Sequence, residues 1–145
     1  MPCAPEELRH VPLFELLDDD EAGILAAQIE VRRFAARQQI YRSGEPSLHG
    51  YILMTGKVLV STTDEDQQEV LVDQPEHGDF FGFASMLAET SHMTSAMATE
   101  DTVCLEVGRD DITELIRARP LAGIDMLTVQ ARQFQASQAL SLIHI

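Results

Sequence analysis

The chain has 145 residues, 45% of them hydrophobic, which is enough for one domain with a continuous core. Its 24 acidic and 10 basic side chains give a net charge of −14, which opposes a nucleic acid backbone and argues against nucleic acid as a partner of this domain. No apolar run reaches the about 18 to 20 residues that cross a bilayer, and no secretory signal is present, so we expect a cytoplasmic protein without a membrane segment.

The N-terminal part of the chain predicts two short helices followed by strands. Apolar residues recur at helical spacing from residue 6 to about residue 27, and Asp18, Asp19 and Asp20 are suited to cap the second helix. Short apolar runs separated by turn residues come next, which is typical of β-strands. We expect these strands at residues 29–34, 39–42, 50–54, 57–62, 69–72, 94–98 and 103–107.

The spacing of these strands predicts the fold class. Many short strands favour an antiparallel sandwich or barrel, and only a short helix fits between Gly82 and Glu89. We therefore predict a mainly β fold with flanking helices, namely a double-stranded β-helix, or jelly-roll-like β-roll, with N-terminal helices and a long C-terminal helix. A helix over residues 112–117, capped by Asp110 or Asp111, is expected to end before Pro120.

A last helix is predicted over residues 121–140. Its apolar positions Ile124, Leu127, Ala131 and Phe134 form a stripe that packs against its own domain or against the same helix of a second copy. We expect a homodimer through this helix. The domain then covers residues 1–140, and the apolar tail of residues 141–145 is interpreted as a truncation or an artificial extension.

Metal and nucleophile chemistry have no support in the sequence. Cys3 and Cys104 lack a CxxC neighbour, and Cys104 lies in an apolar run, as expected of a core thiol. The histidines show no HxH or HExxH spacing of the kind found in metal sites such as those of cupin enzymes: they are His10, His49, His77, His92 and His144. A GxSxG motif is also absent. We therefore predict no enzyme, no catalytic residue and no metal site.

Four short motifs carry a family resemblance. They are VPLF at residues 11–14, IYRSGE at 40–45, YILMTGKV at 51–58 and GDFFG at 78–82. With these motifs in this order, the chain resembles the cyclic nucleotide-binding domain of catabolite-activator-type regulators and kinase regulatory subunits, over about residues 8–138. The Gly that the family places early in the domain is Arg37 here, which we expect to relax one turn.

The resemblance implies a phosphate-binding cassette that begins at Gly82. In the family, this Gly is followed by a Glu that accepts the ribose 2′-hydroxyl, and an Arg further on pairs with the cyclic phosphate. Phe83 and His92 stand at these positions here, so both the acceptor and the guanidinium are lost. A hydrogen bond to a charged group contributes about 1.5 to 3 kcal/mol, so we expect cyclic nucleotide affinity to fall by about two to four powers of ten.

The rest of the implied cassette is polar. Backbone N–H groups at Ala84 and Ser85, with nearby hydroxyls, remain available to orient a ligand. The predicted ligand-binding residues are Gly82, Phe83, Ala84, Ser85, His92, Met93 and Thr94. For Phe83, core packing is favoured over a stacking platform. For His92, two interpretations stay open: an anion contact that strengthens as pH falls, and a polar loop residue.

The resemblance therefore predicts a non-catalytic, ligand-sensing regulatory domain. The candidate ligands are a cyclic nucleotide, cyclic AMP or cyclic GMP, and a different small molecule; no cofactor is fixed. Two alternatives stay open: a ligand-free interaction or dimerisation module, and the sensor half of a transcription regulator cut before its DNA-binding part.

Overall fold

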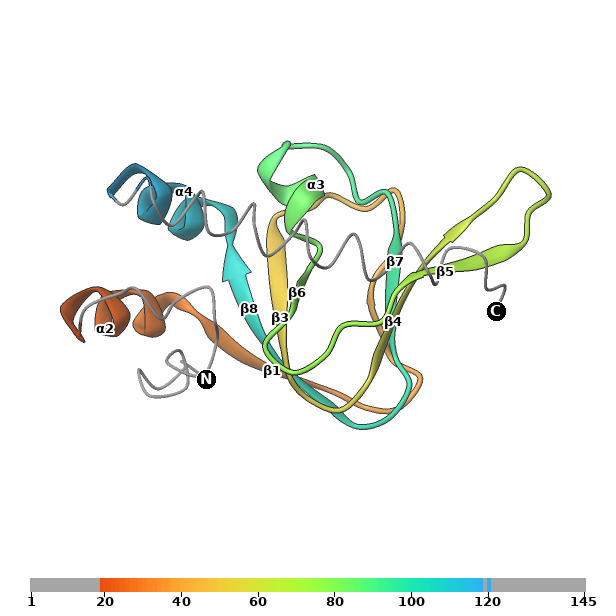
Figure 1. The fold of residues 1–145 in the computed structure, drawn as a ribbon, viewed down its shortest axis with the longest axis horizontal. Helices are drawn as coiled ribbons and strands as arrows, with labels where there is room; N and C mark the ends of the chain where they lie inside the picture. Colours follow the sequence, from red (N-terminus) through yellow and green to blue (C-terminus); the bar gives the residue numbers. More distant parts are fainter. Residues whose placement is uncertain (1–18, 119, 121–145) are drawn as a thin grey trace.

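The computed structural model describes residues 19–118 and residue 120 of the chain. Helix α2 (Asp19–Gln28) leads into two antiparallel sheets, and α4 (Arg109–Ala118) follows the last strand (Figure 1). A short helix, α3 (Phe83–Leu87), interrupts the strands. The first predicted helix and the predicted C-terminal helix over residues 121–140, with its expected dimer contact, lie outside the described residues.

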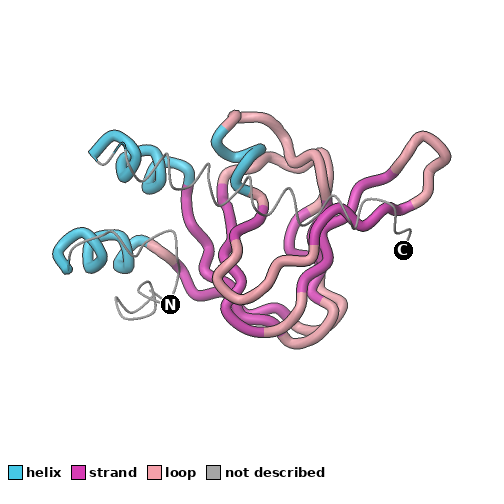
Figure 2. The backbone as a smooth tube through the Cα atoms, viewed as in Figure 1, coloured by secondary structure: helices cyan, strands magenta, loops and turns pink. Residues whose placement is uncertain are grey.

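Each sheet has four strands. The first, in the order β1-β8-β3-β6, contains β1 (Glu30–Phe34), β8 (Thr102–Gly108), β3 (His49–Thr55) and β6 (Phe80–Phe81). The second, in the order β2-β7-β4-β5, contains β2 (Gln39–Tyr41), β7 (Ser95–Ala98), β4 (Val58–Thr63) and β5 (Glu69–Asp73). All strand pairs are antiparallel. The two sheets face each other, with the helices beside the first sheet and the β4–β5 hairpin extending away from it (Figure 2).

The central strands of the first sheet, β3 and β8, are largely buried on both faces and apolar on both sides, whereas the edge strand β1 exposes Glu30, Arg32 and Arg33. In β8, Leu105 and Val107 face the helices, whereas Cys104 faces the second sheet, as the two-residue period of a strand requires. The helix-side core draws on all three helices and both central strands: it contains Ala22, Leu25, Ala26, Ile29, Ile52, Phe80, Phe83, Met86, Leu105, Val107 and Ile112. This core holds α3 and α4 on the same face of the sheet.

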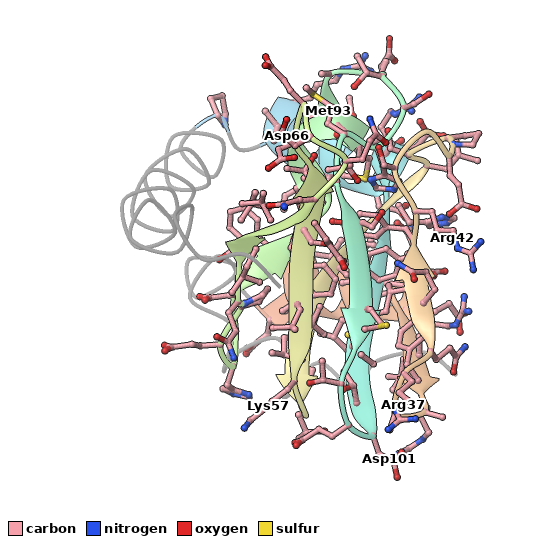
Figure 3. The ribbon with its side chains drawn as sticks, turned by 90° about the vertical axis from the view of Figure 1, so that its right-hand side faces the viewer. Arg37, Arg42, Lys57, Asp66, Met93 and Asp101 are labelled. Carbon is pink, nitrogen blue, oxygen red and sulfur yellow. The ribbon has the colours of Figure 1, made fainter. Side chains whose placement is uncertain are left out.

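A second core fills the space between the sheets. It contains Phe34, Tyr41, Tyr51, Leu53, Val58, Val60, Phe81, Ala96, Ala98 and Cys104. The intervening residues of β4 and β7, such as Leu59 and Met97, lie on the outer face of the second sheet, which Figure 3 shows toward the viewer. The interior of the roll is therefore closed by large side chains.

The predicted fold class is confirmed for the described residues: a mainly β roll of two antiparallel sheets with flanking helices. The short helix after Gly82 is present, and α4 begins at Arg109, three positions before the predicted Ile112. Cys104 is fully buried, as expected of a core thiol.

The expectation that Arg37 relaxes its turn is wrong. Arg37 has a φ of 71°, in the left-handed region that Gly adopts without cost. Its N–H donates to the Ala98 carbonyl at 2.7 Å, and Ala98 returns a bond to the Gln38 carbonyl at 3.0 Å. These bonds between loop and β7 hold the turn in its tight form although the residue is not Gly.

Candidate functional site

The turn at Gly82 brings the parts of the predicted cassette together. Gly82 has a φ of 76°, and a Cβ added to it would lie 3.1 Å from the Tyr41 ring and 3.4 Å from the His92 ring. A larger residue here is opposed both by its backbone conformation and by these two rings. Gly82 therefore lets α3 begin in direct contact with β2 and with the loop before β7.

The side chain of Phe83 points away from the roll interior. It is 1% exposed, and its ring lies 5.0 Å from that of Phe80 in the helix-side core. Gly50 of β3 makes room for it, since a Cβ at Gly50 would overlap the Phe83 ring. The structure thus places the ring in the core, the interpretation that the sequence favoured, and leaves only the backbone of Phe83 at the start of α3.

His92 is buried in the opposite direction, inside the roll. It is 5% exposed, and its ring stacks on Tyr41 with a centroid distance of 3.8 Å and an interplanar angle of 12°. Its Nδ1 is buried without a hydrogen-bond partner. Burial lowers the pKa of His92 below its ordinary value, and the nearby Glu45 carboxylate only partly opposes this. The imidazole is therefore neutral at physiological pH.

Tyr41 fills the space between the predicted site residues. Its ring contacts Gly82 and His92, and its hydroxyl lies 3.4 Å from Thr94 Oγ1. Burial raises the pKa of Tyr41 to about 12, so the phenol is protonated. The ring also stacks with Phe81 and Tyr51, at centroid distances of 6.3 and 6.0 Å. The interior next to the cassette is occupied by the protein's own aromatic side chains.

The main chain around His92 is fixed by bonds to the loop between β2 and β3. The His92 N–H donates to the Glu45 carbonyl at 2.9 Å, and the Gly44 N–H donates to the His92 carbonyl at 2.8 Å. Pro46 and Ser91 form an isolated bridge beside them. The loop between β2 and β3 and the segment around His92 are thus held together by hydrogen bonds, although they are far apart in the sequence.

The other predicted site residues divide between surface and interior. Met93 is 75% exposed and lies at one end of the second sheet, away from Arg37, Lys57 and Asp101 at the other (Figure 3). Ser85 and Thr94 are half-buried. The Ser85 carbonyl accepts the Thr90 N–H at 3.1 Å, which folds the chain back after α3. The backbone of Ala84 lies within α3.

Sequence reasoning missed Tyr41 as part of this site. The two residues that meet there, Tyr41 and Thr94, are 53 positions apart in the sequence. Only the antiparallel pairing of β2 with β7 brings the two side by side. The aromatic residue in the IYRSGE motif was the one available signal.

Three further observations concern the described residues. Within residues 19–118, no group of three or more His, Cys, Asp or Glu side chains is arranged to hold a metal ion. Among the helices that the structure describes, none is both long and apolar enough to cross a membrane. A groove of about 360 Å³ lies on the outer face of the second sheet, but its lining includes none of the predicted site residues.

The described residues form a β-roll in which a Gly turn is followed by a short helix and a loop. The turn and the loop both contact Tyr41 of β2. A family model of the cyclic nucleotide-binding domain matches residues 31–119, and the chain belongs to this family. The family predicted from the motifs is therefore confirmed.

Relatives of known name agree with this assignment. The chain is 30% identical to the cyclic AMP receptor protein of Thermus thermophilus over 124 residues, which cover 86% of the chain and 57% of that protein. It is 30% identical over 103 residues to a cGMP-dependent protein kinase of Eimeria tenella, covering 71% of the chain and 10% of the kinase. The chain thus spans little more than half the length of the first of these relatives, and a small part of the second.

A solved structure shows the same fold. The catabolite activator protein of Thermus thermophilus superimposes with a TM-score of 0.75 at 29% identity, over 88% of this chain and 60% of that one.

Proposed function

We propose that the chain is a non-catalytic, ligand-sensing regulatory domain that works in the cytoplasm. Membership of the cyclic nucleotide-binding domain family supports this, as do relatives named as a cyclic AMP receptor protein and a cAMP-dependent protein kinase regulatory subunit. The chain spans 57% of the first of these proteins and 29% of the second, so the proposal concerns the sensing part of such a regulator.

The neutral, stacked His92 carries the proposal for how a ligand is recognised. An imidazole without charge gives a cyclic phosphate neither a cation nor a guanidinium fork. A ligand is then held by neutral donors: the N–H groups at the start of α3 and the hydroxyls of Ser85 and Thr94. We therefore propose cyclic AMP and cyclic GMP as ligands of about millimolar affinity. An uncharged planar ligand, such as a nucleoside, should lose less affinity than a cyclic nucleotide, because it has no phosphate that needs a cation.

A ligand-free interaction module is the second candidate. The observation that favours it is Tyr41, whose ring lies among Gly82, His92 and Thr94 and occupies the space that a ligand would need. In this case the roll is kept for assembly and its interior is packed permanently. In the ligand-sensing candidate a small molecule displaces the Tyr41 ring, whereas in the ligand-free candidate the ring stays in place.

The partners follow from the same reasoning. We propose a homodimer through residues 121–140, on the apolar stripe that the sequence places there. The net charge of −14 supports a domain that does not itself bind nucleic acid. A relative named as a CRP-like cAMP-activated global transcriptional regulator supports the alternative that the chain is the sensor half of a transcription regulator.

Isothermal titration with cyclic AMP and cyclic GMP tests the proposal. The parent chain and His92→Arg are titrated to millimolar ligand at about pH 7.5 and about pH 6, the latter just below the ordinary pKa of His. His77→Arg serves as a matched control, because it makes the same substitution at an exposed histidine outside the predicted cassette. We expect weak binding by the parent, about tenfold tighter binding by His92→Arg, and no gain with His77→Arg.

Two outcomes separate the candidates. No heat from either the folded parent or folded His92→Arg contradicts ligand sensing through this cassette and supports the ligand-free module. Binding by the parent that strengthens at the lower pH as much as a histidine of ordinary pKa would allow contradicts the lowered pKa of His92.

A further inference from the structure

The groove on the outer face of the second sheet is lined by one polar and one apolar row of side chains. Its volume of about 360 Å³ falls within the range of small-molecule sites. Ser95 of β7 lies opposite Ser61 of β4, and Met97 lies opposite Leu59 in the same pair of strands. Residues two apart in a strand share a face, so the two serines form one row of the groove and the two apolar side chains form the next.

The polar row has opposite charges at its two ends. Glu69, the first residue of β5, accepts the Ser61 hydroxyl on Oε1 at 2.7 Å, which holds its carboxylate beside β4. Arg42 lines the groove at the β2 side of the same face (Figure 3). None of the ion pairs found among the described residues involves Arg42, and the Glu45 carboxylate accepts only its main-chain N–H. The groove therefore offers a carboxylate at one end and a guanidinium at the other.

The hydroxyls between these ends are oriented by bonds within the protein. The Ser43 N–H donates to Ser95 Oγ at 3.0 Å, so the hydroxyl hydrogen of Ser95 is left to donate to another group. Ser61 donates its own hydrogen to Glu69, so its oxygen is left to accept. Acceptors thus lie toward β5, and donors lie toward β2.

Charge and length select the class of ligand. A simple anion would be repelled by the Glu69 carboxylate and by the net charge of −14, and a simple cation would be repelled by Arg42. A molecule with an ammonium at one end and a carboxylate at the other matches both ends. Strands β2 and β5 are three strand spacings apart, roughly 14 Å, and the two charged side chains line the groove between them. The remaining span fits two or three extended residues, at about 3.3 to 3.6 Å per residue.

We propose that this groove binds a short peptide of two or three residues with free termini. Its ammonium pairs with Glu69, and its carboxylate pairs with Arg42. Between them, a peptide N–H donates to the Ser61 oxygen, and the Ser95 hydroxyl donates to a peptide carbonyl. An apolar side chain of the peptide packs on the apolar row. The site lies apart from the cassette, so it goes beyond the proposed function and does not depend on it.

A titration of the full chain with the tripeptide alanyl-leucyl-alanine, followed by backbone amide resonances, tests the proposal. We expect about millimolar binding that shifts the amides of Ser43, Leu59 and Ser95. The same peptide with an acetylated N-terminus or an amidated C-terminus lacks one of the two charges. Each blocked peptide should bind about tenfold more weakly, the scale of one lost hydrogen bond between charged groups.

Two substitutions assign each terminus to its partner. Arg42→Gln should weaken the free peptide about tenfold and leave the C-terminal amide bound as in the parent, because the charge pair is already lost there. Glu69→Gln should do the same for the acetylated peptide. Arg37→Gln and Glu65→Gln are matched controls, since both remove an exposed charge outside the groove, and neither should change binding.

Three results would overturn the proposal. The first is the absence of shifts in the groove at about 10 mM tripeptide with the folded parent. The second is a loss of affinity on Arg42→Gln or Glu69→Gln that is the same for free and blocked peptides. The third is equally tight binding of ω-aminooctanoic acid, which carries both charges but no peptide group. None of these results bears on the cassette, which the cyclic nucleotide titration tests separately.

Discussion

Phe83 and Gly50 provide the sharpest test of where the cassette side chains point. The Phe83 ring is buried against the position that a Gly50 side chain would take. Phe83→Ala removes a fully buried ring, which costs about 3 to 5 kcal/mol of unfolding free energy in a protein core. Gly50→Ala pushes a methyl group into the ring and costs about 1 to 3 kcal/mol through overpacking.

The double variant separates core packing from a site role. Once Phe83→Ala has vacated the space, the Gly50→Ala methyl group fits, so its cost should vanish. We therefore expect the two changes to be non-additive by about 1 to 3 kcal/mol. Urea unfolding of the parent, both single variants and the double variant measures this cycle. If Phe83→Ala leaves too little stability to measure, Phe83→Leu takes its place.

Additive costs would refute this reasoning, because they would mean that the ring of residue 83 does not lie against Gly50. An unchanged stability on Phe83→Leu would point the same way, since an exposed ring contributes little to the core.

Two more predictions concern buried groups. Because the pKa of His92 is lowered in the folded state, unfolding free energy should fall as pH drops below about 6.5, where the unfolded chain takes up a proton that the folded chain resists. His92→Phe keeps the stacking and should weaken this pH dependence in urea titrations, whereas an unchanged slope would contradict a neutral His92. Burial raises the pKa of Cys104 to about 12, so in a Cys3→Ser variant a thiol reagent should label the chain only upon unfolding. Rapid labelling of the native chain would argue against a closed core.

Much of the fold could be predicted from local patterns. Short apolar runs bounded by turn residues marked each of the longer strands, as expected of strands that lie in a core. The Asp residues at the start of α2 and in the first turn of α4 signalled helix starts, because side-chain acceptors and negative charge stabilise exposed N–H groups there. Such signals lie within a few residues of the element that they predict.

Arg37 shows where local patterns fail. A side chain at a position where Gly is usual suggested a relaxed turn, but bonds to β7 hold Arg37 at a positive φ. Hydrogen bonds to the distant strand β7 outweighed the preference of a non-Gly residue for a negative φ. The sequence around residue 37 does not indicate these bonds, because their partner lies about sixty positions further along the chain.

The sequence by itself determined that this protein is a β-roll with a Gly turn before a short helix, and that the residues at positions 83 and 92 are Phe and His. Only the tertiary structure decided what those residues do. Packing sent the Phe83 ring into the helix-side core and the His92 ring against Tyr41 in the roll. It also brought Arg109 onto carbonyls of α3 and of the loop before β3. These contacts join segments that are distant in the chain, so they are set by the pairing of strands and the filling of a shared core, which no local pattern encodes.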